Sequence, residues 1–465
     1  MCDYNNISPL DSRYKEFSPS LYNNFVEIFS ENGFLKYCAK VEFALLETLQ
    51  EFNICPKAPL QDIEISISQV YEEEKRTEHQ QSALVNVIRR KVPDNIKPYV
   101  HLFATSFDIV DTARALQLKD FVKKIFSPLA GDFINILIEL AQQYKSAVQI
   151  GRTHGRFAEP ITFGFYLVNF LDRFGRVFKD VHNRTNNLCG KLSGAVGSFA
   201  ALTLTDRNPL EIEESFLKKL GLQPNPLHLS TQIVHPESVI SLLLEFAKGF
   251  TILANIADDF RHLMRSEINE IIVEKEKNTI GSSTMPHKIN PKDFEQIKSL
   301  WKKFLPQVLT FFMDEISEHQ RDLTNSASGR FIGEFLYAFS YSLEKMTRIL
   351  KNLHFNFKSA QENLRKAKGE IFAEPLYISL ALSGEKAPYQ LVYDFINKLR
   401  ENGETDNYQQ KIKEEDKFQR VLKIEKFAKV ILEPQTYTGM CTKLTEDSIN
   451  YWRKEIKKSH ILYPE

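Results

Sequence analysis

Residues 236–264 read PESVISLLLEFAKGFTILANIADDFRHLM, and this stretch decides the fold class. Its large apolar side chains recur at every third or fourth position: Val239, Leu243, Phe246, Phe250, Leu253, Ile256, Phe260 and Met264. That spacing places them on one face of an α-helix. Pro236 falls in the first helical turn, where its missing N–H costs nothing. The pattern continues to about residue 275, which predicts a helix beyond the usual length of ~8–20 residues.

Four further segments are also long, helical in period and almost free of internal proline and glycine. They are residues 106–147, 162–188, 292–318 and 330–352. Helices of this length are typical of a bundle, and they normally bury more than one face. We therefore expect the bundle to continue into partner subunits.

Shorter helical patterns precede and follow these long segments. The sequence predicts an all-α chain of three domains. These are a small N-terminal domain over 1–105, a central long-helix bundle over 106–356 and a small helical C-terminal domain over 357–465.

Composition supports a soluble globular protein and excludes several classes. The chain has 465 residues, with 60 Lys plus Arg against 60 Asp plus Glu, so its formal net charge is zero. That balance argues against a nucleic-acid or membrane-surface partner. The most apolar stretch carries Glu245, Lys248, Asp258 and Asp259, so we expect no membrane span. The five cysteines form no C-x-x-C pair, and the N-terminus lacks a signal-peptide pattern, so a cytoplasmic location is expected.

The residues that could carry chemistry gather in the loops between the long segments. The clearest loop is GSSTMPHKINP, residues 281–291, which places two serines, a lysine and an asparagine close together. The others are GRTHGR (151–156), TSFD (105–108), RDLTNS (321–326) with Arg330, and SPLDSRY (8–14). Each also fits a plainer role: polar loops are common, and Thr105 or Ser106 could simply cap a helix. We place His154 at a helix end.

Other catalytic signatures are absent from the sequence. It contains no GxGxxG after a strand, no GxxxxGK[ST], no HExxH and no GxSxG. The glycine-rich run over 190–197 has the glycine spacing of neither phosphate-binding motif, GxGxxG or GxxxxGK[ST]. Nucleotide-cofactor chemistry and metal-dependent hydrolysis therefore have no support, and we expect no metal or organic cofactor.

The loop over 281–291 closely resembles the signature G-S-S-x-M-P-x-K-x-N-P of the fumarase/aspartase superfamily. Within it the chain is similar to the adenylosuccinate lyase branch. The matching motifs follow the expected order along nearly the whole chain: SPLDSRY, RTHG, AEPITFG (158–164), SGAVG (193–197), TQI (231–233), RDLTNS and AEPL (373–376). The resemblance implies a mainly helical, three-domain chain in a homotetramer whose active sites draw loops from three subunits.

The resemblance also implies a reaction, the β-elimination of fumarate from adenylosuccinate and from SAICAR in purine biosynthesis. Ser282 matches the general base and His154 the general acid, while Glu295 matches the carboxylate that orients this histidine. Lys288 matches a catalytic group that holds the substrate carboxylate. The positions that match substrate-binding groups are Arg13, Tyr14, His79, Gln80, Thr105, Ser106, Gln232, Ser283, Asn290, Gln296, Arg321, Ser326 and Arg330.

Two positions depart from the family pattern. Gln80 stands where the family usually has an aspartate directly after the histidine that His79 matches. Ile289 stands where many relatives carry arginine. Two alternatives stay open. The chain could be another fumarate-releasing lyase of the superfamily, such as argininosuccinate lyase, or a structural paralogue without catalysis.

Overall fold

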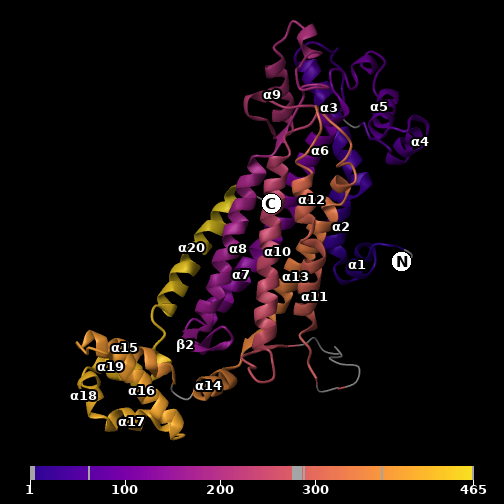
Figure 1. The fold of residues 1–465 in the computed structure, drawn as a ribbon. Coiled ribbons are helices and arrows are strands. Elements are labelled where there is room, and N and C mark those ends of the chain that lie inside the picture. Colours follow the sequence, from indigo (N-terminus) through magenta and orange to yellow (C-terminus); the bar gives the residue numbers. More distant parts are fainter. Residues whose placement is uncertain (1–5, 61–62, 275–284, 286–287, 368–369, 463–465) are drawn as a thin grey trace. The chain divides into compact units, whose positions relative to one another are not determined.

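The computed structural model describes residues 6–60, 63–274, 285, 288–367 and 370–462, and most of them are helical (Figure 1). The chain divides into two compact units. Unit 1 comprises Met1–Ala130, Arg176–Thr251 and Ser299–Glu344. Unit 2 comprises Gly131–Gly175, Ile252–Lys298 and Lys345–Glu465. The boundaries fall inside the helices α7 (Ser127–Gln143), α8 (Phe163–Asn186), α10 (Glu237–Leu263), α11 (Lys292–Phe304) and α13 (Ile332–Lys351).

Unit 1 contains the N-terminal helices, the start of the long-helix region and a short parallel strand pair. Its further elements are α1 (Arg13–Phe17), α2 (Pro19–Phe29), α3 (Glu31–Glu51), α4 (Ile67–Thr77), α5 (Gln80–Lys91), α6 (Ser106–Phe121), α9 (Pro209–Lys219), α12 (Gln307–Met313), β3 (Cys189–Gly190) and β4 (Gln223–Pro224). A π-helical segment, Val122–Phe126, continues α6 without a break. The helices α4 and α5 form a pair beside α3 (Figure 1).

Aromatic side chains fill the core of unit 1 where α6, α10 and α13 meet. The ring centroid of Phe246 lies 5.3 Å from that of Phe121 and 5.6 Å from that of Phe339. Phe126, in the π-helical segment, lies 5.2 Å from Phe246 with the rings nearly perpendicular. Edge-to-face contacts of this kind add to the gain from burying apolar area.

Unit 2 contains two antiparallel strand pairs and the C-terminal helices. The strands β1 (Val148–Thr153) and β2 (Arg156–Thr162) form a hairpin, and β5 (Ile271–Val273) pairs with β6 (Leu353–Phe355). The helices are α14 (Phe357–Lys366), α15 (Ala373–Leu382), α16 (Pro388–Glu401), α17 (Tyr408–Glu414), α18 (Asp416–Leu422), α19 (Glu425–Leu432) and α20 (Cys441–Leu462).

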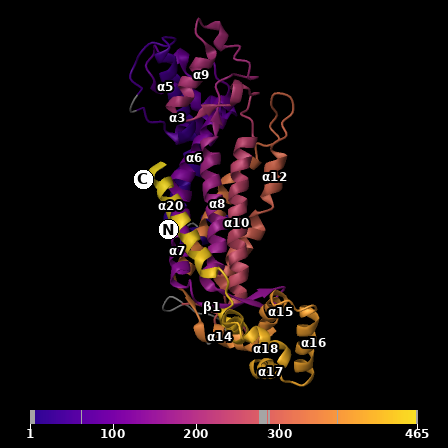
Figure 2. The same ribbon diagram turned by 90° about the vertical axis from the view of Figure 1, so that its left-hand side faces the viewer.

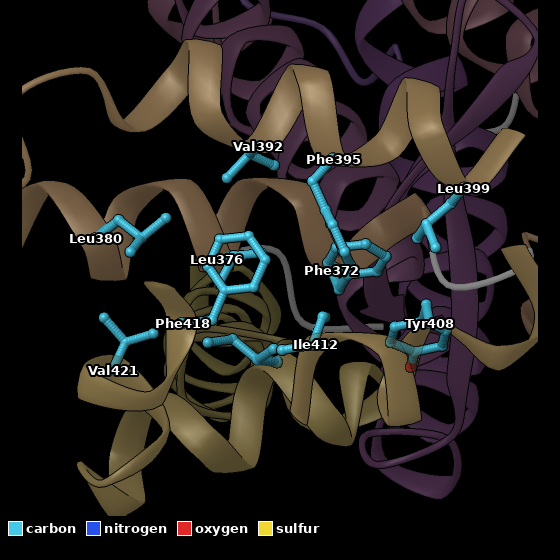
Figure 3. Packing of buried hydrophobic residues seen from close by; sticks show 11 residues of the cluster. Phe372, Leu376, Leu380, Val392, Phe395, Leu399, Tyr408, Ile412, Phe418 and Val421 are labelled. Atoms are coloured by element: carbon cyan, nitrogen blue, oxygen red, sulfur yellow. The ribbon is translucent and has the colours of Figure 1, made fainter. Parts of the chain in front are cut away.

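The helices α15 to α19 enclose a hydrophobic cluster of their own (Figure 3). Its buried members are Phe372, Leu376, Leu380, Val392, Phe395, Leu399, Tyr408, Ile412, Phe418, Val421 and Ile431. The helix α20 runs alongside α8 (Figure 2). The buried ring of Trp452 in α20 packs directly on Gly175 in α8. Gly175 permits this contact because a side chain there would overlap the indole.

The predicted all-α class is confirmed, with several local corrections. The helix expected to reach residue 275 ends at Leu263, and residues 271–273 form β5 instead. The segment 292–318 is not one helix, because α11 ends at Phe304 and α12 begins after Pro306. His154 does not lie at a helix end but at the tip of the β1–β2 hairpin. The proposed domain boundaries at 105 and 356 stay a prediction.

One helix in the described part of the chain, α10, is long and apolar enough to cross a membrane by length and composition. Of its most apolar window, 67% is buried inside the protein. This is the burial of a core helix, because a membrane span would present its apolar surface to lipid.

Candidate functional site

A cavity of about 740 Å³ opens within unit 1. Segments far apart in the sequence line it: the α2–α3 junction, the start of α5, one face of α6, residues 232–236, α10 and residues 321–333. Seven of the residues proposed from sequence lie in its wall: His79, Gln80, Ser106, Gln232, Arg321, Ser326 and Arg330. Thr105 adjoins the wall, since its Oγ1 accepts a hydrogen bond of 3.4 Å from Gln232 Nε2.

The start of α6 is fixed by a network of buried polar groups. Thr105 is the N-cap, and its backbone N–H donates to Asp108 Oδ2 at 2.7 Å, as in a capping box. Asp108 is fully buried, where it also accepts from the Ser193 backbone N–H at 3.0 Å and pairs with Lys191. The capping role considered for Thr105 is therefore confirmed, and it holds Ser106 in the cavity wall.

His79 begins the next helix along the wall. It is the N-cap of α5, and its Nδ1 accepts a hydrogen bond of 3.2 Å from the Ser82 backbone N–H. A neutral His79 therefore carries its proton on Nε2, which makes that atom a donor. Beside it, Gln80 Nε2 donates to Glu31 Oε2 at 3.3 Å, and Arg330 forms an ion pair of 2.6 Å with the same carboxylate.

Arg321 is the most enclosed of the predicted cationic groups in the wall. Its guanidinium lies 4.1 Å from the centroid of the Phe107 ring, a cation–π contact. Burial lowers the pKa of Arg321, while the carboxylates of Asp111, Asp322 and Asp314 act in the opposite direction. Its Nε is buried and has no hydrogen-bond partner among the described residues. Arg321 is thus an unsatisfied donor in an otherwise packed wall.

Several proposed residues lie outside this cavity or outside the described residues. Arg13 and Tyr14 belong to α1 and are not among the described residues that line it; the Tyr14 ring packs edge-on against Tyr341 at 5.2 Å. Ser282 and Ser283 lie outside the residues that the structure describes.

The remaining proposed groups belong to unit 2. Lys288 and Glu295 are exposed, and Asn290 and Gln296 are partly buried. Glu295 occupies the first turn of α11, and its backbone N–H donates to the Pro291 carbonyl oxygen at 3.2 Å.

His154 occupies a two-residue turn between β1 and β2. The φ angles of His154 and Gly155 are 51° and 73°, so both residues are in the left-handed region that such turns require. His154 is exposed, and in the described part of the chain it forms no ion pair with Glu295. The hairpin itself is anchored by Arg152, whose Nη1 and Nη2 donate to the two carboxylate oxygens of buried Glu270 at 2.9 and 2.8 Å.

Sequence reasoning missed several charged residues of the cavity wall, among them Asp111, Arg114 and Asp314. The carboxylate of Asp111 accepts a hydrogen bond of 3.0 Å from the Val234 backbone N–H, which ties residues 232–236 to α6. Burial raises the pKa of Asp111 and of Asp314, and the charges of Arg114 and Arg321 oppose this. For Asp111 and Arg114 the helical spacing from Phe107 was a usable signal, because 107, 111 and 114 share one face of α6.

The cavity wall combines apolar side chains with charged groups of both signs. Its cations are the guanidinium groups of Arg114, Arg321 and Arg330, and its carboxylates are those of Glu31, Glu74, Glu78, Asp111, Asp314 and Asp322. The three guanidinium groups can hold an anionic group of a small molecule, and the apolar part of the wall can hold an aromatic ring. Within the residues that the structure describes, no group of three or more His, Cys, Asp or Glu side chains is arranged to hold a metal ion.

Comparison with known proteins gives family matches over most of the chain. The family described as Lyase matches residues 12–303, and the family described as Adenylosuccinate lyase C-terminal matches residues 317–438. The adenylosuccinate lyase of Pyrococcus abyssi is 30% identical, covering 96% of this chain and 98% of that protein. The adenylosuccinate lyase of Archaeoglobus fulgidus is also 30% identical, covering 97% of this chain and 100% of that protein.

A solved structure supports the fold independently. The fumarate lyase from Mesorhizobium sp. BNC1 superposes with a TM-score of 0.77 at 20% identity, covering 92% of this chain and 97% of that one. At this identity the likeness concerns the fold alone.

Proposed function

The chain belongs to the adenylosuccinate lyase family of the fumarase/aspartase superfamily, and we propose that it releases fumarate by β-elimination from adenylosuccinate, giving AMP, and from SAICAR, giving AICAR. One observation carries the proposal: seven positions that match the family's substrate-binding groups come from distant segments and line one cavity. An inactive structural paralogue would not need to keep these side chains around a cavity.

The chemistry assigns each proposed catalytic group a task. Removing a proton next to a carboxylate creates an aci-carboxylate with two negative charges, so the site must stabilise charge with fixed donors. We assign the charge of Lys288 and the amide of Asn290 to this task. The elimination needs no metal or organic cofactor, because the leaving group only has to gain a proton.

The two proton transfers fall to Ser282 and His154. A serine acts as a base only where nearby cations and N–H donors stabilise its alkoxide, and Lys288 lies six positions along the same loop. Histidine suits the acid role, because its ordinary pKa of ~6.5 lies near neutral pH. We assign Glu295 the orientation of His154.

We further propose a homotetramer with shared active sites, working in cytoplasmic purine biosynthesis. Support comes from the family resemblance, from the long helices α8, α10 and α13, and from the lack of a His154–Glu295 ion pair within the described part of one chain. Each site would then take its acid from a neighbouring subunit.

The decisive experiment measures fumarate release from purified protein given adenylosuccinate, SAICAR or argininosuccinate. We expect turnover of the two purine substrates only. Turnover of argininosuccinate alone would assign the chain to the rival lyase, and no turnover of any substrate would support the non-catalytic alternative.

Single variants test the assigned roles. Ser282→Ala and His154→Ala should each lower kcat by several orders of magnitude without changing the oligomer. Mixing the two inactive variants under conditions of verified subunit exchange should restore part of the activity. Lack of any recovery would contradict shared sites.

A further inference from the structure

Arg114 is a cavity-wall residue that the proposed function leaves without a task. It projects from the face of α6 that lines the cavity and is partly buried, with its guanidinium 6.0 Å from the Phe34 ring centroid. Among the described residues it has no hydrogen bond or ion pair, and the carboxylates of Asp111 and Asp314 act on its charge from a longer distance. A partly buried guanidinium is normally paired, since removing its charge from water is costly.

The backbone opposite Arg114 leaves room for this side chain. Gly329, in the turn Ser328–Arg330, lies so close that a methyl group there would overlap the guanidinium nitrogens of Arg114. Arg114 therefore sits directly beneath the turn that carries Arg330, one of the residues proposed to hold the nucleotide.

Arg321 is a second arginine of this wall, and it has an unsatisfied donor. Its Nε lacks a partner among the described residues, and no carboxylate there lies within ion-pair distance of it. The charge of Arg114 is near enough to act on that of Arg321. The carboxylates of Asp111 and Asp314 act on both guanidinium groups but form no ion pair with either among the described residues. Both guanidinium groups can therefore donate to one anion that binds them together.

The other arginines proposed for the nucleotide are less available. Arg330 is already engaged by Glu31 at 2.6 Å, and Arg13 is not among the described residues lining the cavity. A phosphate monoester carries close to two negative charges at neutral pH and has three acceptor oxygens. It can accept from two guanidinium forks at once, whereas one fork already matches a carboxylate.

We infer that Arg114 is a further substrate-binding residue, which together with Arg321 holds the phosphate of the nucleotide. This inference rests on the proposed function, because it takes the occupant of the cavity to be a purine nucleotide. In this role Arg114 contributes to the affinity for the phosphate group and takes no part in the proton transfers.

The test compares binding of AMP and of adenosine, which differ only in the phosphate, by titration calorimetry. Arg114→Met should weaken AMP binding about 10- to 100-fold, the effect of losing hydrogen bonds to a charged group. Adenosine binding should stay unchanged. Arg114→Lys should fall between, because lysine keeps the charge but loses the fork. Arg184→Met is the matched control, since Arg184 is exposed on α8 and removes one positive charge away from the cavity.

Gly329→Ala offers a second route that leaves Arg114 in the sequence. The added methyl should displace the guanidinium and weaken AMP binding in the wild-type background. In the Arg114→Met background the same change should have no further effect. Equal weakening in both backgrounds would show that Gly329→Ala acts without Arg114.

Three results would overturn the inference. They are an AMP affinity within about twofold of wild type in Arg114→Met, an equal loss of adenosine affinity, or no binding of AMP by the wild type. If Arg114→Met keeps its affinity for AMP but loses affinity for fumarate in the same assay, the inference is also overturned, because Arg114 then binds a substrate carboxylate. Failure of the proposed function is a separate result, the absence of fumarate release from adenylosuccinate by the wild type.

Discussion

The ion pair that anchors the β1–β2 hairpin gives a quantitative prediction. Glu270 is fully buried, and Arg152 is 17% exposed at its side chain. Arg152→Met removes both guanidinium donors and leaves the carboxylate with one side-chain donor, Asn363 Nδ2 at 2.9 Å. Breaking a buried pair from one side costs about 3–5 kcal/mol, because the remaining charge stays buried without its partner.

A double variant separates the cost of leaving Glu270 buried without a partner from the net contribution of the ion pair to stability. Arg152→Met with Glu270→Leu removes both charges and replaces them with apolar groups, which is often close to neutral. Asn363 then keeps its hydrogen bond of 2.7 Å to the Ile268 carbonyl oxygen. We therefore expect the double variant to be more stable than the single variant by about 2 kcal/mol or more.

The assay is equilibrium urea unfolding followed by circular dichroism, at one fixed protein concentration so that any subunit association is equal in all samples. An Arg152→Met protein within about 1 kcal/mol of wild type would refute the reasoning. So would a double variant less stable than the single one. Because the hairpin carries His154, kcat should fall in both variants even where stability recovers.

Three further predictions concern packing and pH. Gly175→Ala places a methyl 2.6 Å from three ring atoms of Trp452, so it should cost about 1–3 kcal/mol and lower the Tm. Phe418→Ala opens the cluster of Figure 3 and should cost about 3–5 kcal/mol, seen as faster amide exchange confined to α15–α19. Burial lowers the pKa of His101, but the Glu42 carboxylate 2.6 Å away more than offsets this and raises it. The stabilisation is thus complete below the unfolded value of 6.5 and is lost as pH rises through the folded pKa; Glu42→Gln should flatten this dependence in unfolding experiments.

The long helices could be predicted from sequence because their signal is local. The segment predicted over 162–188 is the helix Phe163–Asn186, and that over 330–352 is Ile332–Lys351. The strands β5 and β6 could not be predicted, since each has three residues and no readable period. Their pairing joins Ile271 to Phe355, and the sequence around each strand contains no signal for a partner so far along the chain.

The cavity residues likewise divide into those with a local sequence signal and those without one. His79, Gln232 and Arg321 were identified from motifs, and the structure brings all three to one wall. Arg114 belongs to no motif. Its importance depends on which face of α6 borders the cavity, and tertiary packing decides that. A helix period tells which residues share a face but not what that face meets.

The turn at His154 and Gly155 separates what the fold prefers from what the proposed chemistry requires. With left-handed backbone at both positions, Asn-Gly is the most favourable pair for such a turn. A variant library sorted by heat tolerance alone should therefore enrich His154→Asn. The same library sorted by growth that depends on purine synthesis should discard it. Opposite rankings at this one position would mark the imidazole as kept by selection for turnover, at the expense of the turn.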